Sequence, residues 1–134
     1  MTTTGAADIA PVGASRRGRV ALVTIGHPPV NALAQPVRRA LRDAIEAADL
    51  DPDVAAIVVC GAGRHFAAGA DMREFDAPPA APLLNDLLLR VEACEKPVVA
   101  ALHGATLGGG AELALACHYR IARTDLSFGL PEIK

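Results

Sequence analysis

The chain has 134 residues, a length typical of a single domain. Hydrophobic residues make up 51% of it and charged residues 21%, a composition that excludes a disordered, highly charged chain. The formal net charge of −2 and the aromatic content of 3% argue against nucleic-acid binding, which needs a basic surface or aromatic stacking platforms. The sequence contains no apolar run long enough to span a membrane, so we expect neither nucleic acid nor a membrane as partner.

Three widely spaced cysteines, Cys60, Cys94 and Cys117, form no CxxC motif and no recognisable disulfide framework. We expect them to be small buried side chains in a reducing compartment. Residues 1–18 lack the basic and long apolar regions of a secretory signal, so we predict a flexible N-terminal tail there and a cytoplasmic protein. The four histidines show no metal-ligand spacing, and we expect no metal site.

Strands and helices alternate along the rest of the chain. In order, the hydrophobic pattern predicts a strand at Arg19–Ile25, a helix at Gln35–Asp49, a strand at Val54–Cys60, a helix at Leu83–Glu95, a strand at Pro97–His103, a helix at Ala111–His118, and short strands at Tyr119–Ala122 and Ser127–Leu130. Val54–Cys60 is apolar throughout, as in a parallel strand with both faces covered. The alternation therefore predicts parallel βαβ units in an α/β fold.

The first predicted helix has two distinct faces. Apolar residues recur at three- and four-residue spacing and define a buried face. The charged residues are expected to form an exposed face with no further role: Arg38, Arg39, Arg42, Asp43 and Glu46. Before this helix, two prolines make His27–Asn31 a rigid turn.

Residues Gly104–Gly110 are predicted to be a glycine-rich turn, whose last three glycines follow a predicted strand and open a predicted helix. Amides in the first turn of a helix have no intrahelical partner, and the helix dipole adds partial positive charge there. Such a turn suits an anion, or an oxygen that becomes anionic in a transition state. Alternatively, the glycines only allow tight packing of the helix on the strand.

The same turn fits neither of the two common phosphate-binding motifs well. Gly108 and Gly110 fit the first two glycines of the dinucleotide motif GxGxxG, but Leu113 occupies the third position. The match is poor, although a nucleotide binder stays a distant alternative. A P-loop is excluded, because no glycine is followed by Lys-Ser or Lys-Thr at the required spacing.

Two acids lie near glycine-rich segments of the chain. Glu112 is just inside the predicted helix, and Glu132 follows a proline in an apolar segment. If both carboxylates reach one apolar pocket, their pKa values can separate into an acid and a base. Individually, Glu112 could simply compensate the helix dipole, and Glu132 could be a solvated loop acid. The small residues of Phe66–Met72 would let a backbone amide reach a ligand, unless the loop is an ordinary flexible one.

Together these segments resemble the crotonase family, the enoyl-CoA hydratases and isomerases. The motifs that support the resemblance are HPPVNAL at 27–33, FAAGADM at 66–72, KPVVAALHGATLGGG at 96–110, Glu112, and GLPEI at 129–133. Three short segments are most similar to the hydratase/isomerase part of multifunctional fatty-acid oxidation proteins: GAGR at 61–64, ALACHYR at 114–120 and GLPEIK at 129–134. The resemblance runs from about Arg19 to the end.

The resemblance implies a fold and a set of functional residues. The fold would be a crotonase-like ββα spiral core, with residues 19–134 as the N-terminal part of an enoyl-CoA hydratase/isomerase domain. The amides of Ala70 and Gly109 would form the oxyanion hole, and Glu112 and Glu132 would be the catalytic acids. Further positions would contact substrate: Ala32, Leu33, Ala68, Asp71, Met72 and Gly108.

The implied reaction adds water to a trans-2-enoyl-CoA in β-oxidation, with Glu112 activating water and Glu132 donating the proton at C2. The same pair could move a double bond from position 3 to position 2. Coenzyme A is part of the substrate, so no separate cofactor or metal is expected. The chain is shorter than the family's domain, so a homo-oligomer or a missing C-terminal half is expected. Another crotonase-type acyl-CoA reaction and an inactive, truncated fragment are the alternatives.

Overall fold

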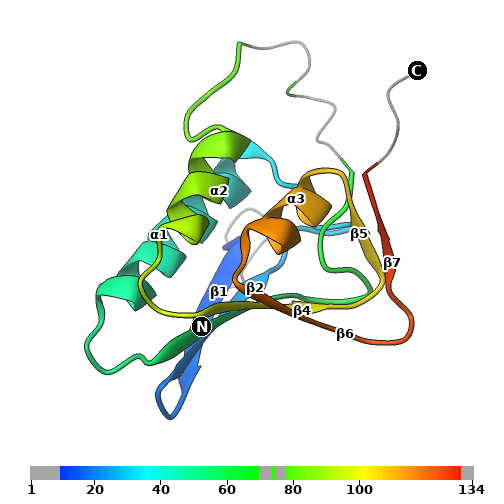
Figure 1. Cartoon of the computed structure of the whole chain (residues 1–134). Coiled ribbons are helices and arrows are strands. Elements are labelled where there is room, and N and C mark those ends of the chain that lie inside the picture. Colours follow the sequence, from blue (N-terminus) through cyan, green and yellow to red (C-terminus); the bar gives the residue numbers. More distant parts are fainter. Residues whose placement is uncertain (1–9, 70–73, 75–77, 131–134) are drawn as a thin grey trace, which may run out of the picture.

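A computed structural model describes residues 10–69, 74 and 78–130. Its main sheet has five strands in the order β1-β2-β3-β4-β6 (Figure 1). The elements are β1 Val12–Arg17, β2 Val20–Ile25, α1 Gln35–Leu50, β3 Ala56–Gly61, α2 Leu84–Glu92, β4 Val98–Leu102, β5 Ala105–Leu107, α3 Gly109–Ala116, β6 Tyr119–Ala122 and β7 Ser127–Gly129. Strands β2, β3, β4 and β6 run parallel, as the βαβ alternation predicted.

Strand β1 corrects the prediction of a flexible tail at residues 1–18. Val12–Arg17 pairs antiparallel with β2, from Val12 opposite Ile25 to Arg17 opposite Val20. Gly18, with φ of +59°, makes the tight turn between the two strands. The strand escaped prediction because most of its side chains are exposed, so it shows no apolar alternation. Residues 1–9 lie outside the described part of the chain.

A second correction concerns the segment 104–110, which was expected to be entirely turn. Ala105–Leu107 forms strand β5, which pairs in parallel with β7 in a separate two-stranded sheet. Three residues are too short to show a strand pattern, and their partner Ser127–Gly129 lies 22 positions further along the chain.

The core lies between one face of the large sheet and the three helices (Figure 1). Ile57 and Val59 of β3 are fully buried in it, together with Leu41 of α1 and Leu113 of α3. The opposite face of β3 is only half-buried, at Val58 among others, so the expectation that both faces are covered is wrong for the described chain. Strands with one covered face alternate in burial, and this alternation is seen in β2, β3 and β4.

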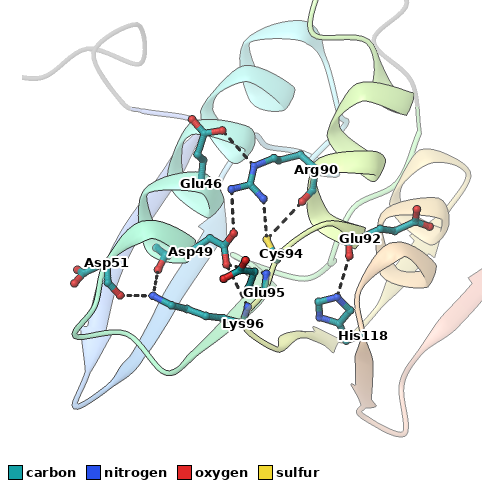
Figure 2. Close-up of polar contacts among 10 residues, drawn as sticks. Glu46, Asp49, Asp51, Arg90, Glu92, Cys94, Glu95, Lys96 and His118 are labelled. Carbon is teal, nitrogen blue, oxygen red and sulfur yellow. Dashed lines mark hydrogen bonds and ion pairs between the residues drawn. The ribbon is translucent and has the colours of Figure 1, made fainter.

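A buried carboxylate joins the end of α1 to the connection between α2 and β4 (Figure 2). Asp49 accepts hydrogen bonds from Arg90 Nη2 at 3.0 Å and from the backbone amides of Glu95 and Lys96 at 3.1 and 3.2 Å. Burial raises the pKa of this carboxyl, but the Lys96 amide and the bonded Arg90 guanidinium outweigh it, and the net pKa is lowered. The cluster thereby ties together two elements more than 40 residues apart.

Candidate active site

Three segments that sequence motifs singled out meet at the start of α3 (Figure 1). Ala67, in the small-residue loop, forms a parallel bridge with Thr106, and its carbonyl accepts from the Leu107 amide at 3.1 Å. The Gly108 amide donates to the Gly129 carbonyl at 3.1 Å. Gly129 is the first residue of the GLPEI motif, so this bond attaches that motif to the glycine turn. The convergence therefore rests on β5, which lies between the loop and β7.

The glycines of the turn allow the close packing that was considered for them, and they leave one amide without a partner inside the helix. A Cβ on Gly110 would lie 2.0 Å from the Ala67 carbonyl oxygen, so this position requires glycine for close packing. Gly108 has a φ of +56°, which favours glycine as the residue before the helix. The first intrahelical bond runs from the Glu112 amide to the Gly108 carbonyl at 3.0 Å. The Gly109 amide comes before this bond and so has no partner within the helix.

Glu112 lies in the first turn of α3, and its side chain is exposed. Its carboxylate is therefore placed beside the positive end of the helix and is accessible to a substrate or to water. Four other predicted site residues lie outside the described part of the chain: Ala70, Asp71, Met72 and Glu132. The oxyanion hole as a whole and the pairing of the two glutamates thus stay predictions.

The remaining predicted contact residues lie close to the turn. Ala32 and Ala68 are buried, with 8% and 5% of their surface exposed, and the Ala68 amide donates to the Val30 carbonyl at 2.9 Å. A side chain on Gly109 would meet Leu33 Cδ1 at 3.7 Å and Leu84 Cδ2 at 3.4 Å. Leu33 and Leu84 therefore lie beside Gly109, the residue whose amide was expected to hold the substrate's oxygen. Leu84 was missed because it lies in the first turn of α2, where sequence shows only an ordinary apolar residue.

Asn31 is a further organising residue that site prediction missed. It has a φ of +58° and is 3% exposed. Its side-chain oxygen accepts from the His27 amide at 2.8 Å, and its Nδ2 donates to the carbonyls of Ala62, His65 and Phe66. These bonds hold the turn that precedes Ala67. An asparagine directly before Ala-Leu, after two prolines, was the available signal.

Two histidines support the backbone, and two hollows lie away from the glycine turn. His65 Nδ1 accepts from the Ala105 amide at 3.0 Å, and His118 Nδ1 accepts from the Val98 amide at 3.0 Å, so both support the backbone. Within the described residues, no three His, Cys, Asp or Glu side chains gather as metal ligands. Two hollows, of about 250 and 450 Å³, lie beneath the β1–β2 hairpin and beside Cys94, away from α3's glycines.

Comparison with known families settles which fold this arrangement represents. The family model described as enoyl-CoA hydratase/isomerase matches residues 15–134. The chain belongs to the enoyl-CoA hydratase/isomerase family. The resemblance to crotonases and the crotonase-like α/β fold are thereby confirmed. Among solved structures, the enoyl-CoA hydratase of Thermoplasma volcanium superposes with a TM-score of 0.83 at 32% identity, over 94% of this chain and 53% of that one.

Two curated relatives show where the chain fits in the family. The peroxisomal bifunctional enzyme of Danio rerio is 54% identical over 114 residues, covering 85% of this chain and 16% of the relative. The probable enoyl-CoA hydratase of Bacillus subtilis is 44% identical over 121 residues, covering 85% of this chain and 47% of the relative. The chain thus spans about one sixth of the first protein and about half of the second.

None of the helices in the described residues is both long and apolar enough to cross a membrane.

Proposed function

We propose that this chain provides the substrate-polarising part of an enoyl-CoA hydratase acting in fatty-acid β-oxidation. The observation that supports it best is the glycine N-terminus of α3. There the Gly109 amide is free of intrahelical bonding, two leucines lie beside Gly109, and Glu112 follows within one turn. The substrate class would be trans-2-enoyl-CoA thioesters.

The proposed reaction proceeds through charge on the thioester oxygen. Glu112 removes a proton from water as the water oxygen bonds to C3, and the π electrons of the double bond move through C2 onto the carbonyl oxygen. The amides of Gly109 and Ala70 donate to that oxygen, and one such donor is typically worth about 2.7–4 kcal/mol of transition-state stabilisation. The electrons then return to C2, which takes a proton from Glu132 and gives the 3-hydroxyacyl-CoA.

The same groups accommodate isomerisation of a 3-enoyl thioester. One glutamate would remove a proton from C2, the oxyanion hole would hold the enolate, and a proton would be returned at C4. The chemistry requires neither a metal nor a separate cofactor. The oligomeric state and the cytoplasmic location stay predictions. Light scattering on the purified chain would measure the first, and cell fractionation the second.

The test follows the loss of enoyl-thioester absorbance with the 134-residue chain and a short trans-2-enoyl-CoA. We expect measurable hydration, and we expect Glu112→Gln to lower turnover by roughly 100-fold or more, since general acid–base groups contribute about that much. Glu92→Gln is the matched control, because Glu92 is an exposed glutamate at the end of α2. A wild-type chain that neither binds nor hydrates the thioester would overturn the proposal.

A further inference from the structure

We propose that Arg38 is a positioning residue that sets the placement of Leu33 and Leu84 beside Gly109 and thereby the acyl-chain selectivity of the site. The inference rests on the proposed function, because it takes the space beside Gly109 as the place of the substrate. Arg38 was expected to lie on an exposed charged face of α1. In the structure it is only 7% exposed, which corrects that expectation and demands an explanation.

The guanidinium of Arg38 is held by oxygen atoms from three separate parts of the chain. Nε donates to the Pro82 carbonyl at 2.7 Å, and Nη2 donates to the Ala80 carbonyl at 3.2 Å. Nη1 donates to the Leu33 carbonyl at 2.8 Å and to Glu74 Oε1 at 3.1 Å. A buried cation is tolerated only when such partners replace its water. The planar fork of arginine reaches several acceptors at once, which a single ammonium group cannot do.

Glu74 completes this cluster from the far side. Its Oε2 accepts from the Gln35 amide at 2.6 Å, at the first residue of α1. Residue 34 is an alanine, which has no side-chain oxygen for the usual N-cap bond, and the first turn of α1 contains no acid. The carboxylate of Glu74 therefore supplies both the cap of α1, from 39 positions away, and the counter-charge of Arg38, from 36 positions away.

The carbonyls bound by Arg38 lie next to the two leucines. One belongs to Leu33 itself, and another belongs to Pro82, two residues before Leu84. Gln35 Nε2 adds a bond to the Ala81 carbonyl at 2.7 Å, so three successive carbonyls face the start of α1. Because both leucines lie within 4 Å of a Cβ built on Gly109, a shift of either backbone would change the space beside that amide.

This arrangement has a consequence for substrates of different chain length. The fit of one methylene group in an apolar pocket is worth about 10-fold or more in discrimination. Removing Arg38 would release Leu33 and the start of α2 without touching the amides or the carboxylate that do the chemistry. We therefore expect Arg38 to govern which acyl chains bind well, and to leave the affinity for coenzyme A itself unchanged.

The experiment compares the wild-type chain with Arg38→Met, Arg38→Lys and the control Arg39→Met. Arg39 is exposed on the same helix, and within the described residues it makes one long bond, to the Ala81 carbonyl at 3.4 Å. Calorimetry gives the Kd of butyryl-, octanoyl- and dodecanoyl-CoA and of free coenzyme A, and hydrogen exchange by mass spectrometry reports on residues 31–36 and 83–88. We expect Arg38→Met to raise hydrogen exchange in those two segments and to change the butyryl-to-dodecanoyl ratio of Kd values by about 10-fold.

The outcomes separate this proposal from the proposed function. Arg38→Lys should lie between wild type and Arg38→Met in both measurements, and it replaces Arg38→Met as the test if the latter unfolds throughout. Local exchange that rises while the ratio of Kd values stays the same would overturn the selectivity role, and unchanged exchange would overturn the positioning role. A wild-type chain that binds no acyl-CoA overturns the proposed function and the selectivity role with it. In that case, the hydrogen exchange of residues 31–36 and 83–88 in Arg38→Met still decides whether Arg38 positions Leu33 and Leu84.

Discussion

The side chain of Asn31 donates to the carbonyl of Phe66 at 3.2 Å, across 35 positions of sequence. Phe66 is fully buried and directly precedes Ala67, whose carbonyl accepts the Leu107 amide next to the glycine turn. The proline turn at residues 27–31 is thereby connected to the start of α3 through one amide group. Asn31 therefore supports the candidate site through this link, although its side chain does not contact the glycine turn.

Substitution of Asn31 should separate its side-chain bonds from its backbone conformation. Asn31→Gly keeps the positive φ accessible but leaves buried carbonyls unpaired, and we expect it to lower the free energy of unfolding by about 2–3 kcal/mol. Asn31→Ala should cost about 1 kcal/mol more, because alanine resists the left-handed conformation. Urea denaturation measures both values. Equal stabilities of the two variants would contradict the role of the backbone conformation.

Asp49 should make stability depend on acid pH. Its pKa is lowered in the folded chain, chiefly by the Lys96 amide and Arg90 acting against burial, so the folded state binds fewer protons than the unfolded state. The resulting stabilisation is present above the ordinary aspartate range near 3.8 and is lost as pH falls through the lower, folded pKa. Asp49→Asn should lower the free energy of unfolding by about 1.5 kcal/mol at pH 7 and flatten this acid-side decline.

The control for Asp49 lies on the same helix. Asp43 is exposed and approaches only Arg42, at 3.6 Å, among the ion pairs of the described residues. Asp43→Asn should therefore change the free energy of unfolding by less than about 0.5 kcal/mol, both at pH 7 and on the acid side. A similar loss in both variants would show that the charge of α1, and not the buried bonds of Asp49, is responsible.

Cys117 should make stability depend on alkaline pH in the opposite sense. Burial raises the pKa of its thiol from 9.0 to about 12, so between these values the folded state keeps a proton that the unfolded state has lost. Stability is then full below about pH 9 and falls as pH rises toward 12, with a limiting slope of about 1.4 kcal/mol per pH unit.

The variant Cys117→Ala isolates this contribution from the other groups that titrate in alkali. Its unfolding free energy, measured by urea denaturation from pH 8 to 10.5, should decline less steeply than that of the wild type. Cys60→Ala is the matched control for the removal of a thiol, because Cys60 is only partly buried. If Cys117→Ala declines as steeply as the wild type, the buried thiol is not the source.

Removal of the Thr106 hydroxyl should stabilise the fold. Its hydroxyl is buried in β5 and has no hydrogen-bond partner among the residues the structure describes. Thr106→Val keeps the branched shape and should raise the free energy of unfolding by about 1 kcal/mol. Thr24→Val is the control, since the Thr24 hydroxyl contacts Cys60 Sγ at 3.4 Å and its loss should bring no gain. Thermal denaturation of both variants would decide.

The sequence by itself determined the order of most helices and strands, the parallel sheet and the family. Each of these depends on local patterns: apolar periodicity for α1, a continuous apolar run for β3, and glycines where α3 begins. Such patterns are visible because a helix or a half-buried strand repeats its environment every few residues. The family resemblance implied that the 66–72 loop, the glycine turn and the GLPEI segment form one site, and the structure supplied the hydrogen bonds of Ala67, Gly108 and Gly129 that bring them together.

Only the tertiary structure decided which polar residues are buried and what they hold. Arg38 has the same sequence surroundings as Arg39, yet it alone turns toward the carbonyls of Leu33, Ala80 and Pro82. Strand β1 likewise shows no apolar pattern and exists through backbone pairing with β2. In both cases most of the partners are backbone groups, which every residue has and no side-chain pattern records. Their directions are set only when distant segments of the chain come together.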